Sequence, residues 1–259
     1  MIIPQWPAPN NVRALATERE LSSSDLKGIS LFPYNNFNLG DHVNDLPVHV
    51  SANRQQLLEQ SSGCEEIRWL QQVHGIDCPD ANLIKDAVAA DATHTQIPAL
   101  ACAVMTADCL PVLFCDLQGR QVAAAHAGWR GLAQGVLANT LQTFIENGIA
   151  SNQVIAWLGP AISQTAFEVG PEVKQAFSYF DDGSRWADEM CFIAGPEDRW
   201  QADLYRLAKL QLEHFGVSGI YGGEHCTYSE LDKDGEARFF SYRRQAISGR
   251  QVSLIWLTK

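Results

Sequence analysis

The chain has 259 residues, and its 19 Lys and Arg against 30 Asp and Glu give a formal net charge of −11. This acidic balance argues against non-specific attraction to nucleic acid or anionic lipid, so an anionic substrate requires a local basic pocket. An apolar share of 46%, with 19 Gly and 11 Pro, excludes collagen, low-complexity disorder and a coiled coil.

The seven cysteines lie singly, without a CxxC pair, which disfavours a disulfide scaffold and favours a reducing compartment. The first residues, Met1–Pro7, lack the basic region of a signal peptide. The longest apolar stretch, Ile97–Ala107, is too short to span a bilayer. We therefore expect a cytoplasmic protein that does not act in a membrane.

The first half of the chain predicts mostly strands. Val12–Thr17 indicates an early strand, a loop rich in Asn and Gly follows over Asn35–Asn44, and Pro47–Glu59 indicates a helix with Pro in its first turn. Four further segments have the alternating or continuous apolar pattern of strands: Glu66–Val73, Ala99–Met105, Leu110–Cys115 and Gln121–Ala127.

The second half mixes helices and short strands. Helical spacing predicts one helix over 131–147, ended by Gly148, and another that begins after the N-cap Asp203 and ends before Gly216. The polar run Asp181–Arg185 indicates a surface loop. Strands are predicted over Val154–Leu158, Val217–Tyr221, Arg238–Tyr242 and Val252–Leu257. Because strands outnumber helices without strict alternation, we predict an α+β fold: a single domain of mixed β-sheets layered with helices over residues 1–259.

Two histidines and a cysteine lie at the ends of apolar strands. They are His74, Cys109 and His126, and each neighbours glycine or a short turn where a pocket can open. Taken singly, each residue fits a structural role, but two imidazoles and one thiolate together suit Zn²⁺ and also accept copper. Their separations of 35 and 17 positions match no zinc finger and fit ligands on separate strands of one sheet. Three protein ligands leave an open position, which is typical of a catalytic metal.

Other roles remain open for the same residues. Cys109 can act as a nucleophile with His126 as its base, which requires a free thiolate. Asp108 is a candidate general acid or base, a hydrogen-bond partner of a ligand imidazole, or an acceptor of backbone hydrogen bonds. The other five histidines have no supporting context and are interpreted as surface or structural residues: His42, His49, His94, His214 and His225.

A possible anion site follows His126. The strand there turns through glycine into a helix that begins near Gly131, and its first N–H groups and Arg130 are suited to phosphate or carboxylate. The alternative is a helix start with a surface arginine. The adjacent Arg243 and Arg244 are predicted on a strand, where one of them reaches the pocket.

Several short motifs in a fixed order make the chain resemble the YfiH-like family, also called laccase-domain or polyphenol-oxidase-type proteins. The motifs include Phe-Asn-Leu-Gly at Phe37, Gln-Val-His-Gly at Gln72, Met-Thr-Ala-Asp-Cys-Leu-Pro at Met105, His-Ala-Gly-Trp-Arg-Gly at His126 and Phe-Ser-Tyr-Arg-Arg at Phe240. The resemblance implies an α+β domain grouped with the catalytic domain of the cytotoxic necrotizing toxins. It also implies zinc bound by His74, Cys109 and His126. We take Asn38, Gln72, Arg130, Gly131 and Arg244 as candidate substrate or phosphate contacts.

The resemblance implies a zinc-dependent purine nucleoside phosphorylase for adenosine, inosine and methylthioadenosine, with adenosine deaminase activity, and a small-molecule partner. One alternative is an amidase that removes misincorporated amino acids from a UDP-muramyl peptidoglycan precursor. Another is a copper-dependent polyphenol oxidase, which the seven histidines support least. A non-enzymatic alternative is a zinc-stabilised binding module, whose metal would have a closed fourth position.

Overall fold

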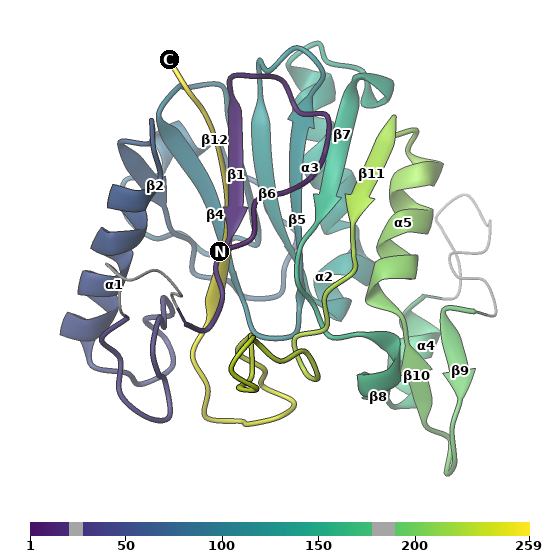
Figure 1. Cartoon of the computed structure of the whole chain (residues 1–259). Helices are drawn as coiled ribbons and strands as arrows, with labels where there is room; N and C mark the ends of the chain where they lie inside the picture. The colour runs from purple at the N-terminus through teal and green to yellow at the C-terminus, as the bar shows by residue number, and fades with distance from the viewer. Residues whose placement is uncertain (21–27, 178–189) are drawn as a thin grey trace.

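The computed structural model describes residues 1–20, 28–177 and 190–259, so the predicted loop at Asp181–Arg185 lies outside the described residues. Two β-sheets form the centre of the molecule (Figure 1). The four-stranded sheet has the order β1 (Val12–Ala16), β12 (Gln251–Leu257), β4 (Leu100–Thr106) and β2 (Glu66–Arg68). The five-stranded sheet has the order β11 (Gly219–Gly222), β7 (Val154–Leu158), β5 (Leu110–Asp116), β6 (Val122–Ala127) and β3 (Ala92–Thr95).

The alternation of side chains along the strands determines how these sheets pack. Val104 of β4 and Ala124 of β6 share one apolar cluster between the two sheets. Ala103 faces the opposite way and packs in a cluster with Leu57 of α1 (Pro47–Gln60). Ala125 likewise faces away from the other sheet, toward helices. The result is helix, sheet, sheet and helices in four layers, which confirms the predicted α+β class.

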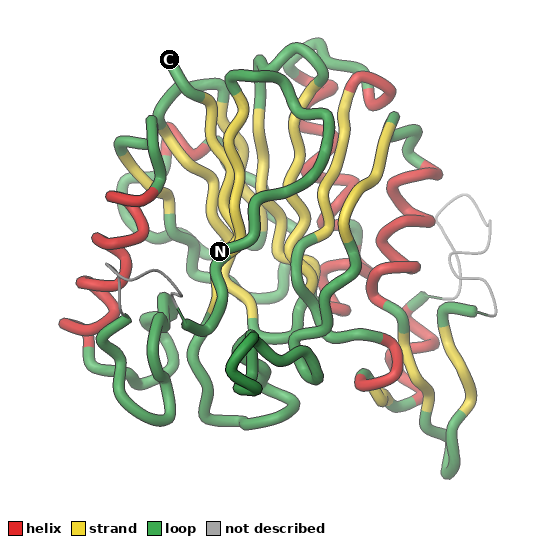
Figure 2. Tube along the Cα trace, in the orientation of Figure 1, coloured by secondary structure: helices red, strands yellow, loops and turns green. Residues whose placement is uncertain are grey.

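Three helices cover the outer face of the five-stranded sheet (Figures 1 and 2). α5 (Leu204–His214) begins as predicted, because the Asp203 side chain accepts a hydrogen bond from the Arg206 amide at 3.0 Å. The helix predicted over 131–147 is two helices, α2 (Trp129–Gln134) and α3 (Val136–Glu146). Gly135 divides them with a left-handed φ of +98°, a conformation that favours glycine.

Two predicted strands differ in the structure. The strand predicted over Glu66–Val73 ends at Arg68, because the Gln72 side chain bonds both backbone groups of Met105 and the segment becomes a loop. Arg238–Tyr242 forms a bend and irregular backbone that leads into a turn at Tyr242, rather than a strand. The sequence patterns do not predict β3, the short helix α4 (Pro171–Ala176) or a small sheet of β8 (Glu168–Val169), β10 (Trp200–Ala202) and β9 (Phe192–Ala194). No helix in the described parts of the chain is long and apolar enough to cross a membrane.

Candidate metal centre

Strand pairing brings the three predicted ligands together. Cys109 directly precedes β5, His126 lies near the end of β6, and Pro111 is opposite His126 in the ladder. His74 lies on the loop that follows β2, with its ring centroid 4.8 Å from that of His126. The potential ligand atoms of His74, Cys109 and His126 all lie within 4.8 Å of one another. Among the described residues this is the one group of three or more His, Cys, Asp or Glu side chains with such spacing.

The donor set fits a tetrahedral metal ion with an open position. Ligand atoms of one zinc ion lie roughly 3.3–3.6 Å apart, so the trio closes around an ion through side-chain shifts of about 1 Å. Gly128 is required for this approach, because a Cβ atom there would lie 2.5 Å from His74 Nδ1 and 3.2 Å from Cys109 Sγ. His126 is 4% exposed, whereas His74 is exposed. The ion would therefore be held from the buried side and remain accessible from the other.

Asp91, directly before β3, orients two of the ligands. This fully buried carboxylate accepts hydrogen bonds through Oδ1 from His126 Nδ1 at 2.7 Å and from the His74 amide at 3.0 Å. Its Oδ2 accepts from the amides of Val73 at 3.0 Å and Gly75 at 2.6 Å. The bond to His126 Nδ1 leaves Nε2 for a metal, and a carboxylate behind a ligand imidazole is the usual outer partner of a bound metal.

The charges around the trio shift the pKa values of its members. Burial lowers the pKa of His126, but Cys109 and Asp91 outweigh this effect and raise it to about 9. For His74, burial and the nearby His126 lower the pKa. Burial raises the pKa of Asp91, yet the hydrogen bonds from His126 and the backbone amides lower it overall. Asp91 is therefore an anion that compensates positive charge at the centre.

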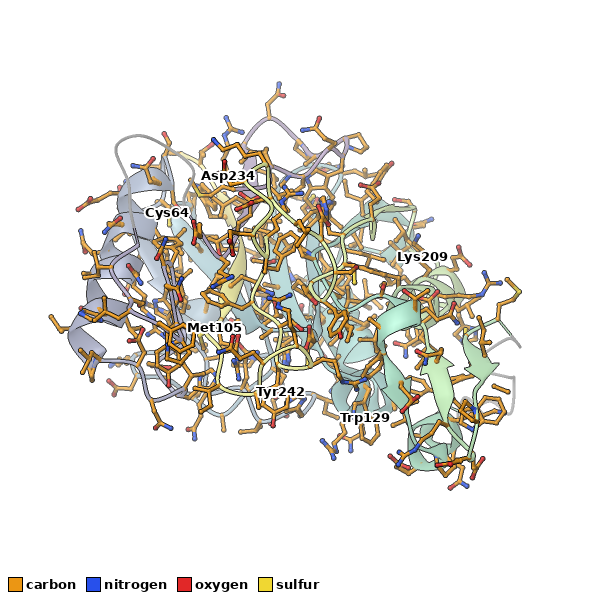
Figure 3. All side chains as sticks on the ribbon, turned by 60° about the horizontal axis from the view of Figure 1, so that its bottom comes forward. Cys64, Met105, Trp129, Lys209, Asp234 and Tyr242 are labelled. Carbon is orange, nitrogen blue, oxygen red and sulfur yellow. The ribbon has the colours of Figure 1, made fainter. Side chains whose placement is uncertain are left out.

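A cavity of about 420 Å³ opens over the centre, and its lining mixes apolar and polar side chains. Met105, Trp129 and Tyr242, all part of the lining, lie at the end of the sheets that comes forward in Figure 3. The apolar part of the lining includes Trp129, Ile162, Phe167, Leu204 and Tyr242, and the polar part includes His42, Gln72, Thr106, Asp108, Arg243 and Arg250. The two kinds intermix, because the Arg243 guanidinium carbon lies 5.5 Å from the Phe167 ring centre. Aromatic rings and cations in one cavity suit a ligand with a flat base and an anionic group.

Asp108 lines the cavity, but its carboxylate is already anchored. Oδ1 accepts from the Thr227 hydroxyl at 2.7 Å, and Oδ2 accepts from the Arg243 amide at 2.7 Å. Its backbone is in the left-handed region, with φ of +94°. The sequence left three roles open for Asp108. The hydrogen bond to a ligand imidazole is made by Asp91 instead, and Asp108 does accept a hydrogen bond from a backbone amide.

The predicted anion site after His126 does not open into the cavity over the metal centre. Arg130 is exposed, lies outside the cavity lining, and its guanidinium carbon is 4.5 Å from the Trp129 ring centre. Gly131 is buried, and a Cβ atom there would lie 2.7 Å from the Gly75 carbonyl oxygen. This glycine therefore allows α2 to pack against the His74 loop, and the cations that line the cavity are Arg243 and Arg250.

Three further predicted contacts have structural partners. The side chain of the buried Asn38 bonds Gly40 and Asp45 and accepts from the Arg250 amide, and it does not line the cavity. Gln72 lines the cavity, but its amide is paired with the Met105 backbone. Arg244 also lies outside the lining, and its guanidinium donates to three backbone carbonyls, those of Thr227, Tyr228 and Phe239.

Comparison with known proteins places this site in a family. Residues 19–258 match the family model described as multi-copper polyphenol oxidoreductase laccase. The purine nucleoside phosphorylase YfiH of Escherichia coli is 45% identical over 99% of this chain and 98% of its own. A purine nucleoside phosphorylase of Pseudomonas aeruginosa is 44% identical over 99% of this chain and 98% of its own.

Solved structures agree with the sequence relatives. A Neisseria meningitidis protein has a TM-score of 0.88 at 43% identity, with 100% of this chain and 99% of that chain covered. YlmD of Geobacillus stearothermophilus has a TM-score of 0.84 at 27% identity, with 98% and 94% covered. The two-sheet fold with its His–Cys–His centre thus defines a YfiH-like protein. The chain belongs to the multi-copper polyphenol oxidoreductase laccase family, as its motifs predict.

Proposed function

We propose that this chain is a zinc-dependent purine nucleoside phosphorylase that accepts adenosine, inosine and methylthioadenosine. The observation that carries the proposal is the three-ligand centre of His74, Cys109 and His126 beneath a cavity lined by aromatic rings and arginines. The names of the Escherichia coli and Pseudomonas aeruginosa relatives support the reaction class. In this proposal residues 1–259 act as one catalytic domain.

The cavity lining offers contacts for both substrates. Trp129 and Phe167 are our candidates to contact the purine, and the Arg250 guanidinium is our candidate to contact the phosphate. Holding both substrates in one cavity makes the attack effectively unimolecular. A phosphate oxygen then forms a bond to the anomeric carbon as the carbon–nitrogen bond to the purine breaks, and the purine takes up a proton. Asp108, which accepts a hydrogen bond from Thr227, is our candidate for the group that donates this proton to the purine.

A zinc ion in this site would supply Lewis-acid polarisation of a substrate or water oxygen. His74, Cys109 and His126 would hold it, and Asp91 would fix the His126 ring and the backbone of His74. The same open position suits attack of water on a purine carbon, so adenosine deamination is our second candidate activity. The nucleophilic role of Cys109 ranks lower, because its sulfur lies among the ligand atoms of the trio.

The alternative activities draw less support from the site. A multicopper oxidase needs several copper centres, and the described residues hold one three-ligand group. An amidase acting on a UDP-muramyl precursor could use the same centre, so it is kept as an arm of the test. A zinc-stabilised binding module would need a fourth protein ligand, and none joins the trio among the described residues.

The test is a side-by-side assay of the zinc-loaded protein. One arm supplies phosphate and each of the three nucleosides and follows release of the free base and the sugar phosphate, and the other supplies the UDP-muramyl precursor and follows release of the amino acid. Cys109→Ser removes the sulfur ligand, and Cys115→Ser, at a buried position on β5 outside the trio, is the matched control. We expect phosphate-dependent release of base that Cys109→Ser abolishes and Cys115→Ser retains. Turnover of the muramyl precursor alone would contradict the proposal.

A further inference from the structure

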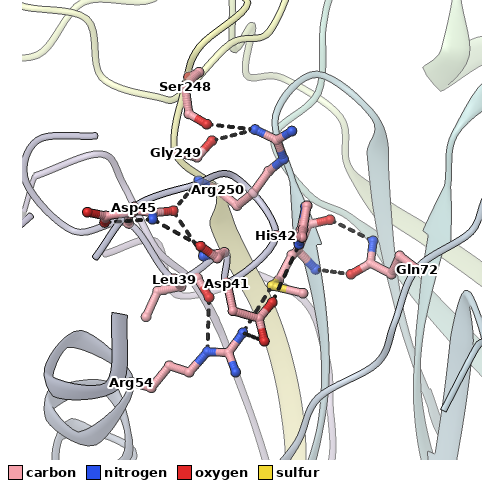
Figure 4. Close-up of polar contacts among 12 residues, drawn as sticks. Leu39, Asp41, His42, Asp45, Arg54, Gln72, Ser248, Gly249 and Arg250 are labelled. Carbon is pink, nitrogen blue, oxygen red and sulfur yellow. Dashed lines mark hydrogen bonds and ion pairs between the residues drawn. The ribbon is translucent and has the colours of Figure 1, made fainter. Parts of the chain in front are cut away.

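Three polar residues of the cavity lining are not metal ligands. They are His42 on the loop before α1, Thr106 at the end of β4 and Arg250 directly before β12. β4 and β12 are paired, and Thr106 lies opposite Gln251, the neighbour of Arg250. A Cβ atom at Gly40 would lie 2.7 Å from Arg250 Cγ, so the loop that carries His42 packs against the Arg250 side chain (Figure 4). The three side chains therefore share one part of the cavity.

Thr106 carries a buried hydroxyl that needs a hydrogen-bond partner. Thr106 is 2% exposed, and its Oγ1 has no hydrogen-bond partner among the described residues. Buried polar atoms in folded proteins are nearly always bonded, because an unpaired one loses its hydration without compensation. Thr106 is part of the cavity lining, so we take a bound ligand as the candidate partner of this hydroxyl.

Arg250 brings a fixed positive charge to the same place. Its Nη1 donates to the carbonyls of Ser248 and Gly249, both at 2.9 Å, which orients the guanidinium (Figure 4). Its backbone amide donates to Asn38 Oδ1 at 2.8 Å, which ties it to the loop before α1. These contacts leave Nη2 and Nε for a ligand. A planar guanidinium with free donors suits the oxygens of a tetrahedral anion.

His42 is held at the cavity by two further side chains. Asp41 Oδ1 lies 3.5 Å from His42 Nδ1, and Asp41 Oδ2 lies 3.3 Å from Arg54 Nη2. Arg54 is fixed in turn. Its Nε donates to the Leu39 carbonyl at 3.0 Å (Figure 4), and its guanidinium carbon lies 3.9 Å from the Trp69 ring centre. With Nδ1 facing the carboxylate, Nε2 is the ring nitrogen of His42 that a ligand can reach.

We propose that Arg250, Thr106 and His42 form an oxyanion subsite that binds inorganic phosphate, and that Asp41 and Arg54 are positioning residues for His42. The identity of the anion rests on the proposed phosphorylase function. Arg250 supplies charge, the Thr106 hydroxyl donates to one phosphate oxygen, and His42 Nε2 accepts a hydrogen bond from the hydroxyl of hydrogen phosphate. The negative charge of Asp41 is paired with Arg54, which limits its repulsion of the anion.

The direct test measures the binding of inorganic phosphate alone to the zinc-loaded protein by calorimetry, followed by KM for phosphate and for the nucleoside. Thr106→Val keeps the side-chain shape and removes the hydroxyl, and His42→Gln removes the imidazole. For each we expect about tenfold weaker phosphate binding, the effect of losing one hydrogen bond to a charged group, with an unchanged nucleoside KM.

The positioning role of Asp41 and Arg54 predicts a distinct pattern of effects on phosphate binding. Asp41→Asn and Arg54→Met should weaken phosphate binding in the same direction by a smaller factor, about threefold, because they act through His42. The double variant of Arg54→Met and His42→Gln should bind phosphate no more weakly than His42→Gln alone. Asp41→Asn carries the test if Arg54→Met fails to fold, because the Asp41 side chain is 58% exposed.

Arg68→Met is the matched control. Arg68 also donates through Nε to a backbone carbonyl, that of Ala81 at 2.8 Å, and pairs with the acidic side chain of Glu66, but it does not line the cavity. Arg68→Met should therefore leave phosphate binding unchanged. Equal weakening by this control would show that loss of an arginine acts through general destabilisation and would overturn the positioning role.

The remaining outcomes separate this proposal from the proposed function. Phosphate binding that is unchanged in both Thr106→Val and His42→Gln overturns the subsite even if nucleosides are turned over. A loss of kcat with unchanged phosphate affinity in His42→Gln also overturns it and assigns proton transfer to His42. Binding of adenosine monophosphate without inorganic phosphate would assign the anion to a substrate ester instead. Phosphate binding that both variants weaken, without any sugar phosphate product, sustains the subsite and overturns only the phosphorylase.

Discussion

Replacing Asp91 by asparagine tests the metal centre without removing a ligand. Each carboxylate oxygen accepts two hydrogen bonds, Oδ1 from His74 and His126 and Oδ2 from Val73 and Gly75. In Asp91→Asn one oxygen becomes an NH₂ group, which cannot accept. Whichever way the amide is turned, two donors that are at least partly buried then face a third donor.

The size of the effect follows from those lost bonds. A fully buried unsatisfied donor costs about 1–3 kcal/mol, and the three backbone amides are only partly buried. The free energy of unfolding should therefore fall by about 1–3 kcal/mol in total. Loss of the partner of a metal-binding imidazole typically weakens metal binding about 10–100-fold. Denaturant unfolding measures the first quantity, and competition between the protein and a chelator for zinc measures the second.

Asp116→Asn is the matched control for Asp91→Asn. Asp116 is also fully buried, and its carboxylate accepts four hydrogen bonds, from the amides of Gln118, Arg120 and Gln121 and from Arg120 Nε. It lies at the far end of β5 from Cys109. We expect a comparable loss of stability with unchanged zinc affinity. Wild-type zinc affinity in Asp91→Asn, or equal weakening in both variants, would refute the assignment of Asp91 as the ligand-orienting carboxylate.

Three further predictions concern the same site. Gly128→Ala should abolish zinc binding measured by metal analysis, because its Cβ would lie 2.5 Å from His74 Nδ1; full zinc content would contradict this. Zinc affinity should rise between pH 6 and 8, by about tenfold per unit for one released proton, because His126, with its pKa of about 9, must lose its proton to bind; a flat chelator-competition profile would refute this. Asp108→Asn should lower kcat about 10²–10⁴-fold with zinc retained, and unchanged kcat would exclude a proton-transfer role for its carboxylate.

The sequence predicts the three ligands because their types and positions carry chemical information. Imidazoles and a thiolate at the ends of apolar strands are few, and the strand pairing of β5 with β6 brings two of them together. The α+β class follows for the same reason, since buried strands and the helix capped by Asp203 have strong local patterns. The break at Gly135 is missed because the apolar spacing of α2 and α3 is continuous across it.

The outer parts of the site depend on contacts that local patterns do not contain. Asp91 is a single aspartate before a short strand, and its role arises only when the loop of Val73–Gly75 folds onto it. Arg130 has the better local signal for an anion site, yet it is exposed, whereas Arg250 reaches the cavity from the far end of the chain. Motifs rich in asparagine or arginine also supply structural residues, as Asn38 and Arg244 show.

X-ray absorption at the zinc edge of the zinc-loaded protein tests the central claim most directly. The account predicts one zinc per chain with one sulfur at about 2.3 Å, two imidazole nitrogens at about 2.0–2.1 Å and one further light atom. Cys109→Ser should remove the sulfur contribution. A protein that binds no zinc, or a zinc coordinated without sulfur, would contradict the account.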